Sequence, residues 1–395
     1  MASAEPTPAA ADPSITNQLV VNVGTRRSVL ARVQTDIVVK ELRKAWPEHE
    51  YEIHAMATMG DKNQVTALHE FNAKSLWTHE LEALLAESKL DMIVHSLKDM
   101  PTQLPSQMSL GCIFPREDPR DALVVKPGLG YTSLSTLPQG AVIGTSSVRR
   151  SAQLKRLFPH LNFADVRGNI GTRLAKLDAE DGQYTALVLA AAGLLRLGMN
   201  DRITSYLSSK EGGILHAVGQ GAIGIEVRSD DTTAKELLAK VGCPHTTLAC
   251  LAERSLLRTL EGGCSVPIGV ETEWITKGVS LSSNVGTGVG VGAKPAADYD
   301  KMTGVAVSGR TGLEQSGETQ GQGNEKTGEL LMRAMVVSLN GEEAVETEMR
   351  RFIETEEQAD EFGWDVARKL VEAGAGKILE DINLNRKIIE EQGDA

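Results

Sequence analysis

Twice along this chain, short apolar runs alternate with stretches whose apolar residues have helical spacing. The first series starts at residues 19–23 and the second at residues 141–143. Strands that alternate with helices favour a parallel sheet with helices on its faces, because parallel neighbours need a long crossover connection. A Gly-Thr turn, at Gly24 and again at Gly144, follows the first strand of each series. The pattern therefore predicts two similar α/β lobes with a cleft between them.

The predicted elements follow from apolar spacing and helix-capping residues. In the first series they are strands at 19–23, 51–57 and 91–94 and helices at 28–46 and 77–87. In the second they are strands at 141–143, 161–164 and 185–189 and helices at 147–158, 170–179 and 190–197. After Pro244 the pattern changes to a helix at 246–260, a Gly-Gly-Cys turn, alternating strands and two closing helices from Glu356. This last part predicts a smaller α+β domain.

Five arginines lie in turns between a predicted strand and a predicted helix: Arg26, Arg149, Arg150, Arg167 and Arg173. Backbone N–H groups at a helix N-terminus favour an anion, and the planar guanidinium suits carboxylate or phosphate. The chain has 53 acidic residues and a net charge of −12, so any single arginine could pair with an internal acid instead. The repeated pattern favours binding of a polyanionic small molecule.

Composition excludes several classes of function. With 395 residues the chain can form two or three domains. A pI near 5.3 argues against non-specific binding to nucleic acid. No apolar stretch reaches the roughly 20 residues of a membrane span, and residues 1–14 contain no basic residue, unlike a signal peptide. We therefore expect a cytoplasmic protein with no nucleic-acid or membrane partner.

The four cysteines, Cys112, Cys243, Cys250 and Cys264, lack the spacing of a disulfide framework, which indicates a reducing compartment. Cys243, His245 and Cys250 resemble a metal cluster only loosely, and no set of four ligands has zinc spacing. Packing explains these three residues better, so we predict no metal site. Neither a P-loop nor a dinucleotide-binding fingerprint is present.

Residues 283–328 are rich in Gly, Ser, Thr and Gln and contain few large apolar side chains. Such a segment cannot bury enough apolar surface to offset the entropy lost on ordering. We interpret it as a flexible insertion between two strands of the last domain, on the side away from the chemistry.

Two short segments could carry chemistry. Lys98 and Asp99 follow the predicted strand at 91–94, where Asp99 could either cap a turn or act as a carboxylate in the cleft. Cys264 follows Gly262 and Gly263, which permit the close approach that an exposed nucleophilic thiolate needs. A lone cysteine is more often an inert, partly buried apolar residue.

Four motifs closely resemble the porphobilinogen deaminase family, also called hydroxymethylbilane synthases. They are Val94-His95-Ser96-Leu97-Lys98-Asp99-Met100-Pro101, Gly144-Thr145-Ser146-Ser147-Val148-Arg149-Arg150, Val166-Arg167-Gly168-Asn169 and Glu261-Gly262-Gly263-Cys264-Ser265-Val266-Pro267. They occur in the family's order, and the resemblance extends from about residue 20 to residue 269, with a looser match through the final helices.

The resemblance implies a transferase of haem (tetrapyrrole) biosynthesis that joins four porphobilinogen molecules head-to-tail into hydroxymethylbilane and releases ammonia at each step. It also implies two α/β lobes similar to periplasmic binding proteins, a third α+β domain, and a dipyrromethane cofactor attached through a thioether. The cysteine that matches the attachment motif is Cys264. Each pyrrole carries an acetate and a propionate, so the polyanion expected from the arginine turns would be the cofactor and the growing polypyrrole. We expect the enzyme to act as a monomer.

The resemblance also implies roles for individual residues. Asp99 would be the essential carboxylate, which stabilises the azafulvenium cation left by deamination, with Lys98 beside it. The residues implied in cofactor binding are Lys98, Thr145, Ser146, Ser147, Arg149, Arg150, Gly168 and Arg173. Those implied in substrate binding are Arg26, Ser28, Gln34, Ser96, Arg167, Arg196 and Gln220.

The expected organisation is a disordered tail at 1–17, a first lobe at 18–116 with 217–242, a second lobe at 117–216, and a cofactor-carrying domain at 243–395. Residues 60–77 follow the family's mobile lid, with Trp77 where phenylalanine is more usual. The insertion at 283–328 is not part of the family's pattern.

Two other functions share part of this pattern. A non-catalytic anion-binding protein of the periplasmic type would have the lobes and the arginine turns, but would not need Asp99 or Cys264. A nucleic-acid-binding protein could use the same basic turns, but the acidic pI and the 4% aromatic content disfavour it.

Overall fold

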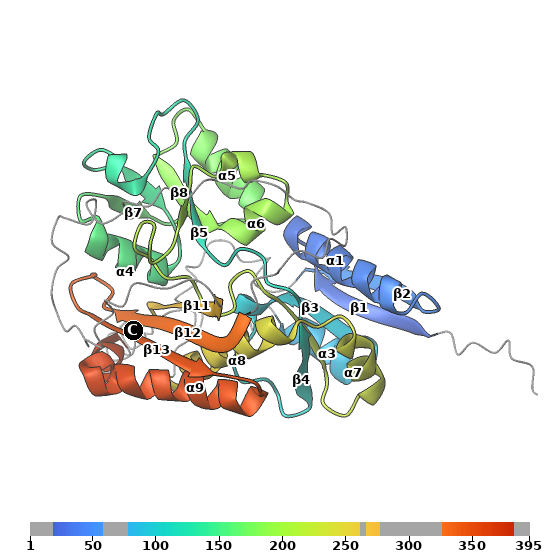
Figure 1. Ribbon diagram of the computed structural model, residues 1–395. Coiled ribbons are helices and arrows are strands. Elements are labelled where there is room, and N and C mark those ends of the chain that lie inside the picture. Colours follow the sequence, from blue (N-terminus) through green and yellow to red (C-terminus); the bar gives the residue numbers. More distant parts are fainter. Residues whose placement is uncertain (1–18, 58–77, 261–265, 277–325, 383–395) are drawn as a thin grey trace, which may run out of the picture.

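The computed structural model describes residues 19–57, 78–260, 266–276 and 326–382, which form three sheets with helices packed against them (Figure 1). The first sheet has the strand order β2-β1-β3-β10-β4. Its strands are β1 (Val20–Arg26), β2 (Glu50–Met56), β3 (Met92–Ser96), β4 (Met108–Ile113) and β10 (Ile223–Arg228). Its helices are α1 (Val29–Ala45), α3 (His79–Ala86) and α7 (Thr232–Ala239).

The second sheet has the corresponding order β7-β6-β8-β5-β9. Its strands are β5 (Asp121–Val125), β6 (Val142–Gly144), β7 (Asn162–Ala164), β8 (Ala186–Ala190) and β9 (Ser205–Leu207). Its helices are α4 (Val148–Leu157), α5 (Ile170–Asp178) and α6 (Ala191–Arg196). These elements form the upper part of the molecule in Figure 1.

Both sheets are mixed: the parallel strands expected from the sequence are present, with antiparallel strands beside them. Three neighbouring strands of each sheet are parallel, but β10 runs antiparallel to β3 and β4, and β5 runs antiparallel to β8 and β9. The chain crosses between the sheets twice, from β4 to β5 and from β9 to β10, and in each sheet the antiparallel strand is the one that follows a crossover, β5 or β10. The expectation of two similar α/β lobes is confirmed by the matching strand orders.

Both Gly-Thr turns require glycine because the strand end packs closely against its neighbours. A Cβ atom at Gly24 would lie 2.5 Å from the Leu90 side chain, and one at Gly144 would lie 2.4 Å from that of Leu187. The helix after each turn is capped by a serine, since Ser28 accepts a hydrogen bond from the Ala31 N–H and Ser147 accepts one from the Arg150 N–H. The same local chemistry therefore begins α1 and α4.

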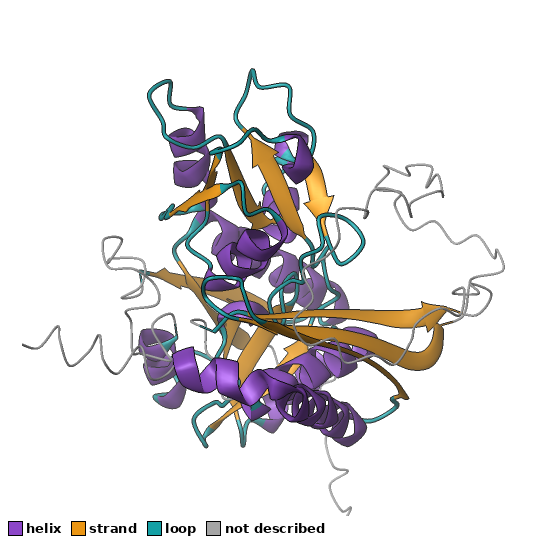
Figure 2. Ribbon diagram, turned by 90° about the vertical axis from the view of Figure 1, so that its left-hand side faces the viewer, coloured by secondary structure: helices purple, strands orange, loops and turns teal. Residues whose placement is uncertain are grey.

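The third sheet is an antiparallel meander of β11 (Ile268–Thr276), β12 (Lys326–Val337) and β13 (Ala344–Phe352). Its long strands cross the middle of Figure 2, with helices beneath them. α8 (Pro244–Thr259) and α9 (Glu356–Leu370) pack with this sheet around one apolar core. α8 begins two residues before the predicted start, because proline is well tolerated in the first turn of a helix.

One boundary differs from that expected: β12 begins at Lys326, so the last three residues of the predicted insertion at 283–328 belong to a strand. The two closing helices predicted from Glu356 are confirmed, since α9 and a helix at 376–382 are separated by a kink at Gly374, whose φ is 107°. The rest of the insertion and the predicted tail at 1–17 lie outside the described residues.

Candidate active site

Lys98 and Asp99 lie in a 3-10 turn, Leu97–Asp99, that directly follows β3. Leu97 is 1% exposed and anchors this turn in the core, whereas Lys98 and Asp99 are partly exposed. The Asp99 carboxylate makes no hydrogen bond or ion pair with any residue that the structure describes, and the turn itself is closed by the Met100 N–H donating to the Leu97 carbonyl. The carboxylate therefore does not cap this turn.

Arg149 and Arg150 lie in the first turn of α4, and both guanidinium groups are buried. Both bind the carboxylate of Asp121, the first residue of β5. Arg149 Nη1 donates to Oδ2 at 2.8 Å, and Arg150 donates to Oδ1 through Nε at 3.0 Å and Nη2 at 2.7 Å. The sequence left open that any single arginine could pair with an internal acid. These two arginines do so.

Asp121 is fully buried, and no signal in the sequence separated it from the many other acids. Burial by itself would raise the pKa of its carboxyl, but Arg149 and Arg150 outweigh burial and hold the pKa well below its usual range. Asp121 is therefore ionised at neutral pH and balances one of the two guanidinium charges beside it.

The side chain of Lys98 faces these arginines from the other sheet. Burial lowers the pKa of Lys98, and Arg149 and Arg150 lower it further, while Asp99 and Asp121 oppose the change. The Lys98 ammonium makes no hydrogen bond within the described part of the chain. The turn after β3 in the first sheet and the start of α4 in the second therefore contribute to one cationic cluster.

Arg173, in the first half of α5, belongs to the same cluster. Its Nε donates to the carbonyl of Gly168 at 2.7 Å, and its Nη groups donate to none of the described residues. Gly168 has a φ of 112°, which a side chain would strain. Burial, Arg150 and Arg167 lower the pKa of Arg173 to about 10, against the opposing effect of Asp99. A ligand carboxylate would relieve this accumulation of positive charge.

The hydroxyl groups near the cluster have partners within the protein. Ser146 Oγ donates to the Val166 carbonyl at 3.0 Å and accepts from its N–H at 3.1 Å, which holds the turn after β6 against the turn after β7. Thr145 Oγ1 accepts from the Ser147 N–H at 3.2 Å, and Ser147 caps α4. These three residues shape the turns, and the Thr145 and Ser147 hydroxyls can still donate to a ligand.

A second group of predicted residues lies at the ends of β1 and β3, which are adjacent because these strands pair in parallel. Arg26 ends β1, Ser28 caps α1, and Ser96 ends β3. Ser96 Oγ donates to Gln34 Oε1 at 3.0 Å, and the Gln34 side chain is buried. Arg167 lies in the turn after β7, where its carbonyl accepts from Lys176 Nζ.

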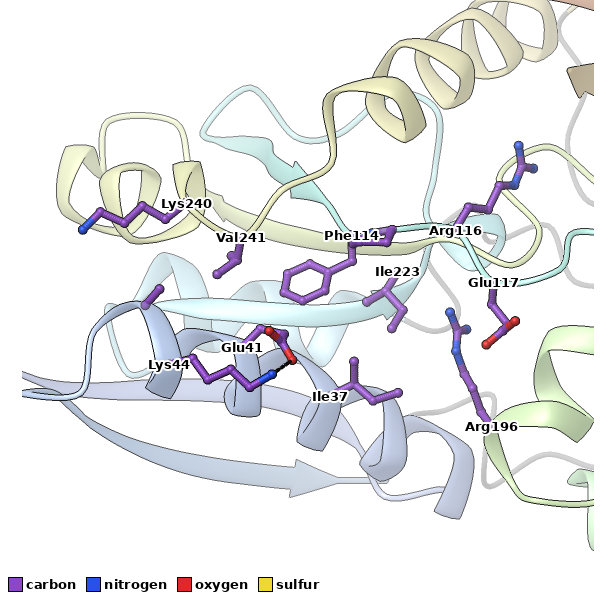
Figure 3. Close-up of a pocket in the computed structure, with 12 residues that line it drawn as sticks. Ile37, Glu41, Lys44, Phe114, Arg116, Glu117, Arg196, Ile223, Lys240 and Val241 are labelled. Atoms are coloured by element: carbon purple, nitrogen blue, oxygen red, sulfur yellow. Dashed lines mark hydrogen bonds and ion pairs between the residues drawn. The ribbon is translucent and has the colours of Figure 1, made fainter. Parts of the chain in front are cut away.

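Arg196 and Gln220 occupy different surroundings. Arg196 lines a pocket of about 590 Å³ beside α1 and the crossover after β4, where its side chain points toward Glu117 (Figure 3). Its Nη2 donates to the Gly221 carbonyl at 2.7 Å, and burial lowers its pKa while Glu117 opposes this. Gln220 is fully buried, and its Nε2 donates to Asp121 at 2.9 Å and to the Pro119 carbonyl at 2.7 Å.

Cys264 and residues 60–77 of the expected lid lie outside the described residues. Three other cysteines are described and free. Burial raises the pKa of Cys112 to about 12, and the pKa of Cys250 is raised in the same way to about 12. A thiol with such a pKa is almost entirely protonated at neutral pH, so neither of these two cysteines is a good nucleophile.

Within the described ranges, no three His, Cys, Asp or Glu side chains are arranged as metal ligands. Cys250 packs in the core, and Cys243 Sγ accepts a hydrogen bond from Thr246. No helix in those ranges is both long and apolar enough to cross a bilayer.

Two similar α/β lobes that contribute Lys98, Arg149, Arg150 and Arg173 to one cluster define a protein that binds a polyanionic small molecule. Two family models match the chain. One is described as "Porphobilinogen deaminase, dipyromethane cofactor binding domain" and matches residues 21–236, and the other is described as "Porphobilinogen deaminase, C-terminal domain" and matches residues 247–293. The chain belongs to the porphobilinogen deaminase family.

Curated relatives support this conclusion over almost the whole length. The porphobilinogen deaminase of Candida albicans is 44% identical over 380 residues, which cover 95% of this chain and 96% of that protein. The porphobilinogen deaminase of Saccharomyces cerevisiae is 42% identical over 371 residues, which cover 93% of this chain and 98% of that protein.

Solved structures with some likeness include a methionine-binding protein, 11% identical, with a TM-score of 0.35 over 57% of this chain and 91% of that chain. Another is an alkanesulfonate-binding protein of Xanthomonas axonopodis pv. citri, 15% identical, with a TM-score of 0.32 over 63% of this chain and 75% of that chain. This likeness is too weak to support a functional conclusion.

Proposed function

We propose that this protein condenses four porphobilinogen molecules head-to-tail into hydroxymethylbilane, with release of ammonia, at the cluster formed by Lys98, Asp99, Arg149, Arg150 and Arg173. The observation that carries the proposal is the unbalanced charge of this cluster. Lys98 and the Nη groups of Arg173 have no hydrogen-bond partner among the described residues, and burial lowers the pKa of both side chains. A ligand with several carboxylates supplies the missing partners.

The residues present fit a dipyrromethane cofactor, because its carboxylates need several cationic donors at one place. Arg149, Arg150, Arg173 and Lys98 would hold those carboxylates, with the Thr145 and Ser147 hydroxyls and the backbone at Ser146 and Gly168 around them. The bound cofactor supplies the pyrrole end to which the first substrate ring is joined. We assign its attachment to Cys264.

We propose that Arg26, Ser28 and Arg167 bind the carboxylates of porphobilinogen, while Gln34 holds the Ser96 hydroxyl in place. Asp99 then stabilises the positive charge that develops on the substrate as ammonia leaves. Because Asp99 has no hydrogen bond or ion pair within the described ranges, its charge is available to a substrate cation or a pyrrole N–H.

We also propose roles for Arg196 and Gln220. Arg196 lies beside the crossover after β4 and donates to Gly221 of the returning crossover, so it could bind a carboxylate at the edge of the cleft. Gln220 donates to Asp121, behind the arginines, and we propose that it supports ligand binding through that contact.

We propose the domain division expected from the sequence, because each of its three folded parts contains one sheet. We further propose a cytoplasmic monomer without nucleic-acid or membrane partners. The three free cysteines among the described residues are typical of a reducing compartment, and the net charge of −12 disfavours contact with phosphate backbones.

The intact mass of the denatured protein tests the proposed function. The wild-type protein should be heavier than its sequence by one dipyrromethane unit and should turn over porphobilinogen. Cys264→Ser should show the bare sequence mass and make no tetrapyrrole, because a hydroxyl is not a nucleophile at neutral pH. The matched variants Cys112→Ala and Cys250→Ala should keep the added mass. A wild-type protein without added mass, or an adduct that survives Cys264→Ser, would overturn the assignment.

A further inference from the structure

The carboxylate of Asp121 joins three side chains that come from different parts of the chain. It accepts from Arg149 at 2.8 Å, from Arg150 at 3.0 and 2.7 Å, and from Gln220 at 2.9 Å, and it is fully buried. Both arginines begin α4, whereas Gln220 lies in the crossover that returns to the first sheet. One buried carboxylate therefore sets the positions of two guanidinium groups relative to that crossover.

Backbone carbonyls also hold both arginine side chains in place. Arg149 Nη1 also donates to the Leu215 carbonyl at 2.6 Å, and Arg150 Nη1 donates to the Val188 carbonyl at 2.9 Å. These bonds leave the Nε and Nη2 groups of Arg149 without a partner among the described residues. All three nitrogens of Arg150 are bonded, so only the second N–H of its Nη1 and of its Nη2 remains for a ligand.

We propose that Asp121 is a positioning residue for the reaction: it orients Arg149 and Arg150 so that their remaining N–H groups meet the carboxylates of the cofactor and the growing polypyrrole. This inference rests on the proposed function. Asp121 touches neither substrate nor reacting atoms, and acts only through the two arginines.

Glu253 provides a matched control because it is an equally buried carboxylate that binds an arginine outside the cluster. It accepts from Arg116 at 2.6 and 3.0 Å, from Thr272 and from the Gly219 N–H at 2.8 Å. Removing either carboxylate leaves a buried guanidinium without its counter-charge, so both losses should destabilise the fold. Only the loss at Asp121 should also disturb ligand binding.

The experiment compares Asp121→Asn with Glu253→Gln, each purified as folded protein. For Asp121→Asn we expect a smaller fraction of molecules with the covalent adduct by intact mass. In the loaded fraction, kcat/KM for porphobilinogen should fall by about 100-fold, since a displacement of about 1 Å in a binding group can cost this much. Glu253→Gln should melt lower but keep its adduct and a KM within about twofold of wild type. Equal losses in the two variants, or full loading and unchanged KM in Asp121→Asn, would overturn the proposal.

A charge-balanced pair of variants keeps the proposal testable if Asp121→Asn does not fold. Asp121→Asn/Arg149→Gln loses one charge of each sign, and Arg149→Gln alone retains the bonds between Asp121 and Arg150. If Asp121 positions Arg150, the Arg150 guanidinium should be misplaced in the double variant. The kcat/KM of the double variant should then be about tenfold below that of Arg149→Gln. If Asp121 only balances charge, the double variant should equal or exceed Arg149→Gln, which would refute the proposal. Wild-type protein without adduct or turnover would instead refute the proposed function.

Discussion

Replacing Arg173 by glutamine tests whether the cationic cluster is destabilised until its ligand binds. Burial, Arg150 and Arg167 together lower the pKa of Arg173 to about 10, more than two units below that of a free guanidinium. A fall of this size corresponds to about 3 kcal/mol of unfavourable free energy for the charged side chain in the folded protein. The substitution also removes the hydrogen bond from Nε to the Gly168 carbonyl, which costs about 1 kcal/mol. Screening by water at this partly exposed side chain reduces the gain, so the net stabilisation should be about 1–2 kcal/mol.

The assay is thermal unfolding in a Cys264→Ser background, in which no cofactor can attach. There, Arg173→Gln should raise Tm by about 2–6 °C, and high salt should reduce the difference because it screens the repulsion. In the loaded enzyme the same change should lower both Tm and activity, because a ligand carboxylate loses its partner. Arg202→Gln is the control, since Arg202 forms a surface ion pair with Asp178 at 2.7 Å and its loss should lower Tm slightly in both backgrounds. If Arg173→Gln instead lowered Tm in the Cys264→Ser background by as much as Arg202→Gln does, the reasoning would be refuted.

Other changes test single groups. Asp99→Asn should keep the fold and the adduct but lose kcat by about two to three orders of magnitude, because removing preorganised charge stabilisation costs about 3–4 kcal/mol; near-normal turnover would remove Asp99 from the chemistry. Arg149→Lys keeps the charge but loses the bidentate fork, so cofactor loading should fall, and full loading by intact mass would contradict this role. Burial raises the pKa of Glu82, and its Oε1 is buried without a hydrogen bond. Glu82→Gln should therefore raise Tm at pH 7 but not below about pH 4, where the carboxyl is protonated in both the folded and unfolded states; a gain that did not depend on pH would rule out this explanation.

Features set by short-range chemistry were predictable from the sequence. The predicted helix at 147–158 corresponds to α4 at Val148–Leu157, since a capping serine and regular apolar spacing lie within the segment itself. The predicted turns place Arg149, Arg150 and Arg173 near the start of helices for the same reason. The two lobes were predictable because this local pattern occurs twice in the chain.

Features set by long-range pairing were not predictable. β10 lies between β3 and β4, more than 100 residues away in the chain. Nothing in its apolar sequence indicates whether it runs parallel or antiparallel to them. Similarly, the sequence contains 53 acids, and nothing marks Asp121 as the one that meets two arginines and Gln220. Two of the predicted ligand-binding arginines consequently have an internal partner that only the folded chain reveals. Three of the five arginines in the repeated pattern, Arg149, Arg150 and Arg173, lie in this cluster, and one carboxylate cannot neutralise these three and Lys98.

The sequence predicts that residues 283–328 are a flexible insertion, and the register of the third sheet allows this to be tested. Thr276 at the end of β11 is paired with Lys326 at the start of β12, so the two strand ends are already neighbours. Deleting residues 285–324 removes 40 of the 49 residues from 277 to 325 and leaves nine, enough for a hairpin connection. Shortening a loop in this way changes its closure entropy by only about 1–2 kcal/mol, in favour of the folded state.

We therefore expect the deletion variant to keep its covalent adduct, its kcat and its KM, and to melt at the same temperature as wild type or a few degrees higher. Thermal unfolding and steady-state kinetics measure these quantities directly. Replacing residues 285–324 by a Gly/Ser segment of the same length separates loop length from loop sequence, because it leaves the closure entropy nearly unchanged. If both variants lost activity or stability, the natural residues of the segment would have to contact the folded protein. The prediction of a passive insertion would then be wrong.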